Sequence, residues 1–369
     1  MFSDYNEKLA KLIVQYAVKI EPEDTVIIKA PTIAEPLVKT VYRETLRAGG
    51  HVILVDLSFD GQDELFFKFT SDNQLKYVNP IKLDIVKTLK KYINIYASFN
   101  TRDLTSVPPE KKVMVAEAGK EMNKIFLERA STKELRWNIS PFPCNAFAQE
   151  ANMGPLEYLE FAYKALNLHQ PDPVKFWQDF EKKQQHIVDI LNKGSFLQII
   201  GEDTDLTLGI AQRPWENCSG HENLPDGEVF TAPIEDAVNG TIRFTYPGIF
   251  SGQEIEDIRL TFKDGKVVDF DADKGKDLLN KIVTTIPNAN ILGELAVGTN
   301  YGIQRFTKNM LFDEKMGGTV HLALGAGYPE TGSKNESSIH WDILKDMKSP
   351  ESKILLDGEM IYKEGKWLI

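Results

Sequence analysis

The sequence has little cysteine: Cys144 and Cys218 are the only two among its 369 residues. Secreted domains that rely on disulfides are rich in cysteine, and two widely separated residues do not make such a framework. The sequence also lacks any run of about 18 apolar residues, the length that a helix needs to cross a bilayer. Its N-terminal stretch is amphipathic and interrupted by charges, unlike a signal peptide. We therefore expect a cytoplasmic protein with no membrane partner.

Basic residues are in short supply, because 43 lysines and arginines stand against 54 aspartates and glutamates, for a formal net charge of -11. Proteins that bind nucleic acids use lysine and arginine to neutralise phosphates, so this balance argues against a nucleic-acid partner. Hydrophobic residues make up 42% and charged residues 26% of the chain, which is typical of a globular protein with a substantial core. The length favours two domains.

Strand and helix patterns alternate in the first half of the chain. Short apolar runs between turn residues predict strands, and amphipathic runs that end at glycine predict helices. Such alternation is typical of a parallel sheet flanked by helices. No G-x-G-x-x-G motif follows the first predicted strand, so a dinucleotide site is not indicated. We expect strands at 24–30, 51–57, 92–99 and 135–140, and helices at 5–20, 33–50 and 110–130.

The pattern changes near the middle of the chain, where helical stretches give way to short strands separated by turn residues. Residues 261–270 carry the Asp-Gly pair that is typical of a β-hairpin. One further helix is expected at about 275–286. We therefore predict an N-terminal α/β domain over residues 1–190. A C-terminal α+β domain with a mainly antiparallel sheet follows over residues 191–369.

Two histidines and an aspartate stand out in the second half. The stretch "SIHWD" places His340 and Asp342 two residues apart in a predicted strand. Because successive strand residues point to opposite faces, these two share one face and Trp341 lies on the other. His321 lies in another predicted strand, "GTVHLALG", beside small residues that leave room for its imidazole. Imidazole nitrogens and carboxylate oxygens bind divalent metal ions, so this pattern indicates a metal site in the second domain.

Glu228 and Glu294 lie in similar apolar surroundings, in "GEVFTAP" and "LGELAVG". A carboxylate among apolar neighbours needs a cation or hydrogen-bond donors. Two imidazoles and three carboxylates can hold two ions such as Zn²⁺, Co²⁺ or Mn²⁺, with one carboxylate bridging them. Each residue alone also has a structural interpretation, as a hydrogen-bonded core histidine or as the partner of an arginine or a helix end. The spacing does not show whether these stretches meet in space.

Four blocks in the second half resemble the thermophilic metallo-aminopeptidase family of the aminopeptidase T and aminopeptidase S type. They occur in the family's order and extend over most of residues 220–345, and this makes the match more specific than a single short motif. The first half is similar to the family's less distinctive N-terminal α/β domain. The blocks are "NLPDGEVFTAP", "LGELAVGTN", "DEKMGGTVHLALGAGYPETG" and "SSIHWD".

This resemblance implies a metal-dependent aminopeptidase that acts on peptides and forms a homodimer. It implies two divalent ions per chain, zinc or cobalt, with manganese or magnesium as alternatives. Tyr328 is implied as a catalytic residue, and we assign Glu294 as the bridging ligand. The stretch 329–339 looks shorter than in the family, which leaves substrate size open. The implied metal ligands are Glu228, Glu294, His321, His340 and Asp342.

The mechanism that we expect begins with a metal-bound hydroxide, because paired ions lower the pKa of a bound water toward neutrality. This hydroxide would attack the carbonyl carbon of the first peptide bond, and the Tyr328 hydroxyl would help to stabilise the oxyanion. Glu228 or Glu294 would carry the proton to the leaving amine. Glu314 is a candidate for binding the substrate's α-amino group, with a simple surface charge as the alternative.

Two other functions fit parts of the pattern. One is a dinuclear metallohydrolase that acts on another bond, such as a phosphoester or a cyclic amide. A phosphoesterase would favour lysine or arginine near the metals, and the four blocks contain only Lys315 and Lys334. The other is a catalytically silent binding protein on the same fold. Suitable ligand types at all five positions argue against a silent protein.

Overall fold

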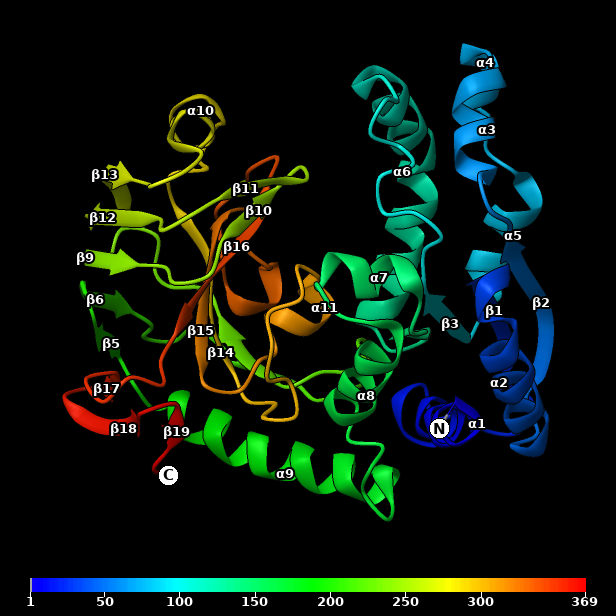
Figure 1. The fold of residues 1–369 in the computed structure, drawn as a ribbon, viewed down its shortest axis with the longest axis horizontal. Helices are drawn as coiled ribbons and strands as arrows, with labels where there is room; N and C mark the ends of the chain where they lie inside the picture. The colour runs from blue at the N-terminus through cyan, green and yellow to red at the C-terminus, as the bar shows by residue number, and fades with distance from the viewer. Residues whose placement is uncertain (1) are drawn as a thin grey trace. The chain divides into compact units, whose positions relative to one another are not determined.

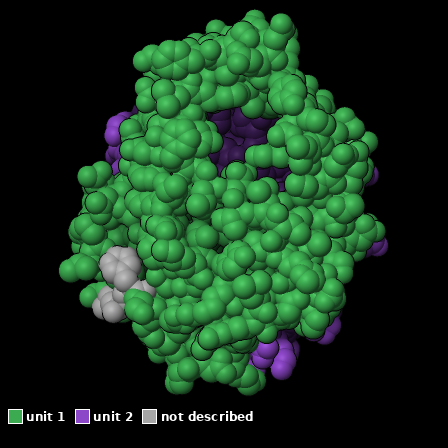
Figure 2. Space-filling model, turned by 90° about the vertical axis from the view of Figure 1, so that its right-hand side faces the viewer, with its two compact units in different colours: residues 1–177, 220–225 green, residues 178–219, 226–369 purple. Residues whose placement is uncertain are grey.

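The computed structural model describes residues 2–369, which fall into two units (Figure 1, Figure 2). Unit 1 extends to Trp177 and includes Gly220–Pro225, and unit 2 contains the rest of the second half. The division falls inside helix α9 (Pro173–Leu191), whereas the sequence pattern puts a boundary near the end of that helix. The boundary after residue 190 therefore stays a prediction.

Unit 1 is built on a four-stranded parallel sheet, as predicted, with the strands in the order β2, β1, β3, β4. Parallel strands need crossover connections, and the helices between the strands provide them. Three successive residues of the inner strand β1, Val26, Ile27 and Ile28, are buried, which is typical of a parallel sheet covered on both faces. The strands are β1 (Thr25–Pro31), β2 (His51–Ser58), β3 (Lys91–Tyr96) and β4 (Arg136–Pro141).

Four short helices of unit 1 were not predicted: α3 (Gln62–Phe69), α4 (Asp72–Leu75), α5 (Pro80–Thr88) and α7 (Asn145–Glu150). With 8 and 9 residues, α3 and α5 are too short for a periodic pattern to distinguish a helix from other structures, and neither contains a buried residue. The other helical segments of unit 1 are α1 (Phe2–Leu12), η1 (Ile13–Ala17), η2 (Thr32–Ala34), α2 (Glu35–Arg47), α6 (Pro109–Ser131) and α8 (Pro155–Ala165).

Within residues 2–369, no helix has the length and apolar character that are needed to span a membrane.

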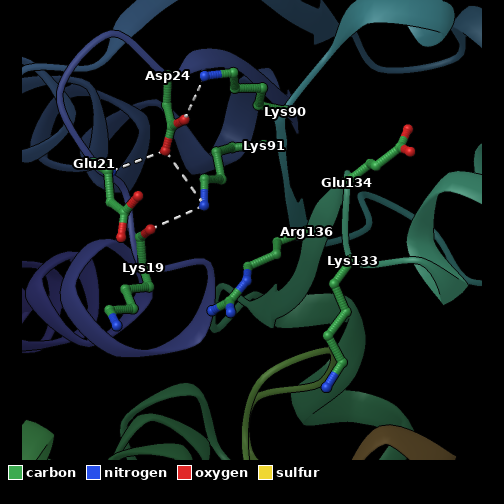
Figure 3. Close-up of a pocket in the computed structure, with 8 residues that line it drawn as sticks. All are labelled: Lys19, Glu21, Asp24, Lys90, Lys91, Lys133, Glu134 and Arg136. Atoms are coloured by element: carbon green, nitrogen blue, oxygen red, sulfur yellow. Dashed lines mark hydrogen bonds and ion pairs between the residues drawn. The ribbon is translucent and has the colours of Figure 1, made fainter.

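Charged residues line a pocket of about 270 Å³ in unit 1, beside the first residues of β1, β3 and β4 (Figure 3). Asp24 accepts a hydrogen bond from the Glu21 amide at 2.9 Å, and its carboxylate lies 3.3 Å from Lys91 Nζ and 3.4 Å from Lys90 Nζ. Lys91 Nζ also donates to the Lys19 carbonyl at 2.9 Å. Ligands of open α/β sheets bind at the opposite, carboxyl ends of the strands. We therefore interpret this ion-pair cluster as structural.

Unit 2 contains two large antiparallel sheets that share one hydrophobic core, and a separate two-stranded sheet formed by β10 and β11 (Figure 1). The larger sheet has eight strands in the order β13, β12, β9, β6, β5, β17, β18, β19, and the smaller has five in the order β16, β15, β14, β8, β7. Leu206 and Ile242 of the larger sheet and Leu295, Leu322 and Ile343 of the smaller belong to a single buried cluster. The second half is therefore mainly antiparallel, as predicted.

The smaller sheet carries the candidate site, and its strands are β7 (Glu216–Cys218), β8 (Glu228–Thr231), β14 (Leu292–Gly298), β15 (Thr319–Gly325) and β16 (His340–Asp346). The larger sheet contains β5 (Phe196–Gly201), β6 (Thr204–Gly209), β9 (Val238–Arg243), β12 (Arg259–Lys263), β13 (Lys266–Asp271), β17 (Lys353–Leu356), β18 (Glu359–Lys363) and β19 (Lys366–Trp367). The remaining elements are β10 (Gly248–Phe250), β11 (Gln253–Ile255), α10 (Lys276–Thr285), α11 (Met310–Asp313) and η3 (Pro329–Thr331).

The predicted hairpin and the predicted helix of the second half are both confirmed. Strands β12 and β13 pair antiparallel, and the turn residues Asp264 and Gly265 have φ angles of 49° and 79°. Two successive left-handed residues are what a two-residue hairpin turn requires. Helix α10 buries Leu279, Ile282 and Val283, which lie on one face because helical residues three and four apart are neighbours.

Candidate metal centre

The strands β14, β15 and β16 bring four predicted site residues to one face of the smaller sheet. Residues directly opposite each other on antiparallel strands share a face. Glu294 lies opposite Ala323, which lies opposite Asp342, so these three form one row across the sheet. His321 comes two residues before Ala323, and His340 comes two residues before Asp342. The period of two therefore places both imidazoles on the carboxylate face.

Glu228 reaches the same face from the neighbouring strand β8. It pairs with Gly298 of β14, four residues after Glu294 and hence on the same side. Small residues fill the positions between the site residues, namely Ala296 opposite His321 and Ala323 opposite both Glu294 and Asp342. Large side chains at these positions would occupy the space in front of the sheet. The structure therefore brings all five predicted ligands together.

Glu294 lies at the centre of the cluster. Its Oε1 atom is 3.2 Å from His321 Nε2, and its Oε2 atom is 3.3 Å from His340 Nε2. His321 Nε2 also lies 3.3 Å from Glu228 Oε2, and His340 Nε2 lies 3.4 Å from Asp342 Oδ1. One carboxylate therefore has an oxygen directed at each half of the cluster.

Among residues 2–369, several buried polar atoms of this cluster form no hydrogen bond, including Glu228 Oε2 and Asp342 Oδ1, although each lies near a histidine nitrogen, at 3.3 and 3.4 Å. Glu228 and Glu294 are only 6% and 5% exposed, and His321 is fully buried. Burying carboxylates that are incompletely compensated costs several kcal/mol per ion, so these acceptors indicate that a cation completes the cluster. This donor set of imidazole nitrogens and carboxylate oxygens fits a divalent metal ion.

The orientation of His340 also fits metal binding. Its Nδ1 atom lies 2.7 Å from the Ala326 carbonyl oxygen and donates to it. This bond directs the lone pair of Nε2 at the carboxylates, which is the usual arrangement of a metal-binding histidine. His321 differs, because its Nδ1 atom has no hydrogen-bond partner among the described residues.

Glu294 and the two imidazoles have shifted pKa values. Burial raises the pKa of the Glu294 carboxyl, but His321 and His340 outweigh burial and lower that pKa to about 2. Burial lowers the pKa of His321, while Glu294, Glu228 and Asp342 raise it to about 9. Burial acts in the same direction on His340, and the adjacent Asp342 and Glu294 carboxylates raise its pKa to about 11. With no cation bound, both imidazoles are therefore protonated at neutral pH.

Residues next to α11 also enter the cluster. A carboxylate oxygen of Glu314, the residue predicted to meet a substrate amine, lies within 4.8 Å of ligand atoms of His321 and Asp342. Burial raises the pKa of Glu314 to about 8, despite the opposing charge of Lys315. Lys315 is 1% exposed, and its Nζ donates to Glu228 Oε1 at 3.0 Å. From the sequence, Lys315 could be recognised only as a basic residue within the four blocks, because its burial depends on the fold.

Tyr328 follows β15 and lies at the rim of the cluster. Its ring packs edge-on against Phe230 at 5.5 Å and lies 5.1 Å from the His340 ring, while the residue stays partly exposed. Burial, together with the nearby carboxylates led by Glu294, raises the pKa of the hydroxyl well above its usual value. The hydroxyl is therefore protonated at neutral pH and can donate a hydrogen bond.

Comparison with known proteins gives a consistent result over the whole chain. The family model of the thermophilic metalloproteases (M29) matches residues 2–367. Aminopeptidase 2 of Geobacillus stearothermophilus is 26% identical over 404 residues, covering 98% of this chain and 97% of that protein. Aminopeptidase AmpS of Bacillus subtilis is 27% identical over 412 residues, covering 99% of both chains. The solved structure of wild-type AmpT from Thermus thermophilus shares the fold, with a TM-score of 0.84, 24% identity and complete coverage of both chains.

Metal binding at pH 7 should release up to about two protons per chain, because an imidazole must be neutral to bind a metal ion. The pKa values of His321 and His340 are raised above the ordinary histidine value of 6.5, so the imidazolium–carboxylate pairs stabilise the fold fully below pH 6.5. This stabilisation is lost as the pH rises through the raised pKa values of about 9 and about 11. Metal affinity should increase over the same pH range, because neutral imidazoles become available as ligands. Calorimetric titration with Co²⁺ in buffers of different ionisation enthalpy measures the release.

His186→Ala, which removes an exposed histidine of α9, serves as the control and should leave proton release unchanged. Heats that do not depend on the buffer at pH 7 would show that the imidazoles are already neutral before metal binds.

Proposed function

The chain belongs to the thermophilic metalloprotease family M29, and we propose on this basis that it is a metal-dependent aminopeptidase that releases N-terminal amino acids from peptides. The observation that carries this proposal is the convergence of His321, His340 and three carboxylates on one buried face of the smaller sheet. The relatives reported above are named aminopeptidases, which supports the same reaction.

Our proposal includes two divalent ions per chain. Glu228, Glu294 and His321 would hold one ion, and Glu294, His340 and Asp342 would hold the other; the ligand atoms within each group lie within 4.8 Å of one another. Glu294 belongs to both groups and is therefore the proposed bridging ligand. Mixed nitrogen and oxygen donors favour zinc or cobalt, with manganese or magnesium as alternatives. Such a pair, when bound, supplies Lewis acidity and lowers the pKa of water.

The chain's own residues would then have separate tasks. The protonated Tyr328 hydroxyl would donate a hydrogen bond to the carbonyl oxygen as negative charge develops on it. The proton of the attacking water would pass to the leaving amine through Glu228, once its Oε1 atom is released by Lys315, or through Glu294, once one of its oxygens is released by a metal ion. Glu314 remains our candidate for contact with the substrate's α-amino group, because a carboxylate oxygen of Glu314 lies within 4.8 Å of ligand atoms of His321 and Asp342.

The alternative functions receive less support. A phosphoesterase needs a cationic side chain that can reach the phosphoryl group, but Lys315 is buried and donates to Glu228 and Glu314. A silent binding protein has no need for buried carboxylate oxygens that form no hydrogen bond within residues 2–369, such as Glu228 Oε2 and Asp342 Oδ1. The homodimer and the cytoplasmic location stay predictions from the sequence.

Glu294→Gln should abolish hydrolysis of leucine-p-nitroanilide with the fold intact. A neutral amide at the shared position weakens both proposed metal sites at once. We expect a loss beyond the roughly 100-fold that is typical when only a ligand's hydrogen-bond partner is changed. Activity should be measured after chelation and again after Co²⁺ or Zn²⁺ is restored, with circular dichroism to check the fold.

Glu359→Gln, an exposed position on β18, is the matched control and should retain chelator-sensitive activity. Full activity in Glu294→Gln would remove Glu294 from the mechanism. Wild-type activity that survives complete removal of metal would contradict the proposed function itself.

Tyr328→Phe should lower kcat by about 100- to 1000-fold, the usual loss when one oxyanion donor is removed, and should leave metal content unchanged. Tyr301→Phe is the control, because Tyr301 is also partly exposed and its hydroxyl donates only to the Gly365 carbonyl. Loss of bound metal in Tyr328→Phe, in place of a loss in kcat, would make Tyr328 a structural residue.

A further inference from the structure

A buried lysine lies among the acidic residues of the candidate metal centre. Lys315 follows α11 and is 1% exposed. Its Nζ atom donates to Glu228 Oε1 at 3.0 Å and to the Glu314 carboxylate. Ligand atoms of Asp226 and Cys218 lie within 4.8 Å of a ligand atom of Glu228, the residue that binds this ammonium group. Fixing a flexible lysine side chain costs rotamer entropy, which the hydrogen bonds to the two glutamates offset.

Three of these neighbours have the composition of a metal site. Ligand atoms of Cys218, Asp226 and Glu228 all lie within 4.8 Å of one another. Cys218 ends β7, Glu228 begins β8, and the two strands pair directly at these residues. A thiolate with two carboxylates is a donor set that zinc and cobalt accept. These three residues therefore form a group of potential ligands, the Cys218 corner, outside the two groups assigned to the proposed pair of ions.

Glu228 connects this corner to the proposed metal centre. Its Oε1 atom accepts from Lys315, and its Oε2 atom lies 3.3 Å from His321 Nε2. Each oxygen of this carboxylate therefore faces a different partner. The Lys315 ammonium compensates the charge of Glu228 on one side and leaves only the other oxygen for a metal ion.

We propose that the Lys315 ammonium group takes the place of a third metal ion among Cys218, Asp226 and Glu228, and so excludes such an ion. By binding Glu228, it also holds this carboxylate in position as a ligand of the proposed pair of ions. This inference rests on the proposed metal centre. Lys315 acts through Glu228 and does not contact the substrate, so it is a positioning residue. A covalently attached ammonium cannot dissociate, and the ion count is therefore set by the chain.

The chain provides a matched control in Lys345, which is also 1% exposed and also lies in unit 2. Its Nζ atom donates to the backbone carbonyls of Glu202 and Arg243 at 3.1 and 3.0 Å. Lys315→Met and Lys345→Met therefore remove equally buried lysines of the same length. Only Lys315→Met removes a positive charge from the acidic cluster.

The test is titration of the metal-depleted full chain with Co²⁺, followed by metal analysis and absorption spectroscopy. Wild type and Lys345→Met should bind two ions and show no thiolate-to-cobalt charge-transfer band. Lys315→Met should bind about one further ion per chain and show that band, because cobalt then enters the corner that contains Cys218. Cys218→Ala added to Lys315→Met should remove the band and the further ion.

Every outcome bears on the proposal. A wild-type charge-transfer band would overturn it, because the corner would then be open to metal. A folded Lys315→Met that binds no further ion would overturn it as well, while leaving the proposed function intact. Failure of Lys315→Met to fold even with Co²⁺ present, when Lys345→Met folds, would also count against it, because a metal ion should replace the ammonium. Wild type that binds no metal would instead contradict the proposed function.

Discussion

Repulsion among buried carboxylates is the physical constraint on which the candidate site depends. Two like charges about 4 Å apart repel by about 4 kcal/mol at an effective dielectric constant near 20. Glu228, Glu294 and Asp342 lie in such a cluster, on or beside fully buried strands. Protonated His321 and His340 offset part of that charge, and divalent ions would offset it more completely. The same charges that make the site costly to fold thus make it selective for cations.

The smaller sheet tolerates the repulsion among these carboxylates because its two faces have different roles. Leu295, Leu322 and Ile343 point to the core shared with the larger sheet and supply apolar burial. The residues between them carry the ligands, or are as small as Ala296 and Ala323. A rigid sheet with one well-packed face holds side chains on the other face with little freedom, and precise placement is what metal coordination needs.

The sequence predicted those features that depend on short-range periodicity. The pairing of His340 with Asp342 on one face follows from a spacing of two, and the Asp264–Gly265 hairpin follows from turn chemistry. Whether separate strands converge is a long-range property that residue spacing within each stretch does not reveal. Only the family resemblance indicated that the five residues meet. The burial of Lys315 beside Glu228 could not be predicted, because an isolated lysine in a sequence is usually exposed.

Anomalous X-ray scattering from crystals of the cobalt- or zinc-loaded protein tests the central claim most directly. The account predicts two peaks about 3.5–4 Å apart, on either side of the Glu294 carboxylate. One peak should lie beside His321 and Glu228, and the other beside His340 and Asp342. A single peak, or peaks away from this face of the smaller sheet, would contradict it.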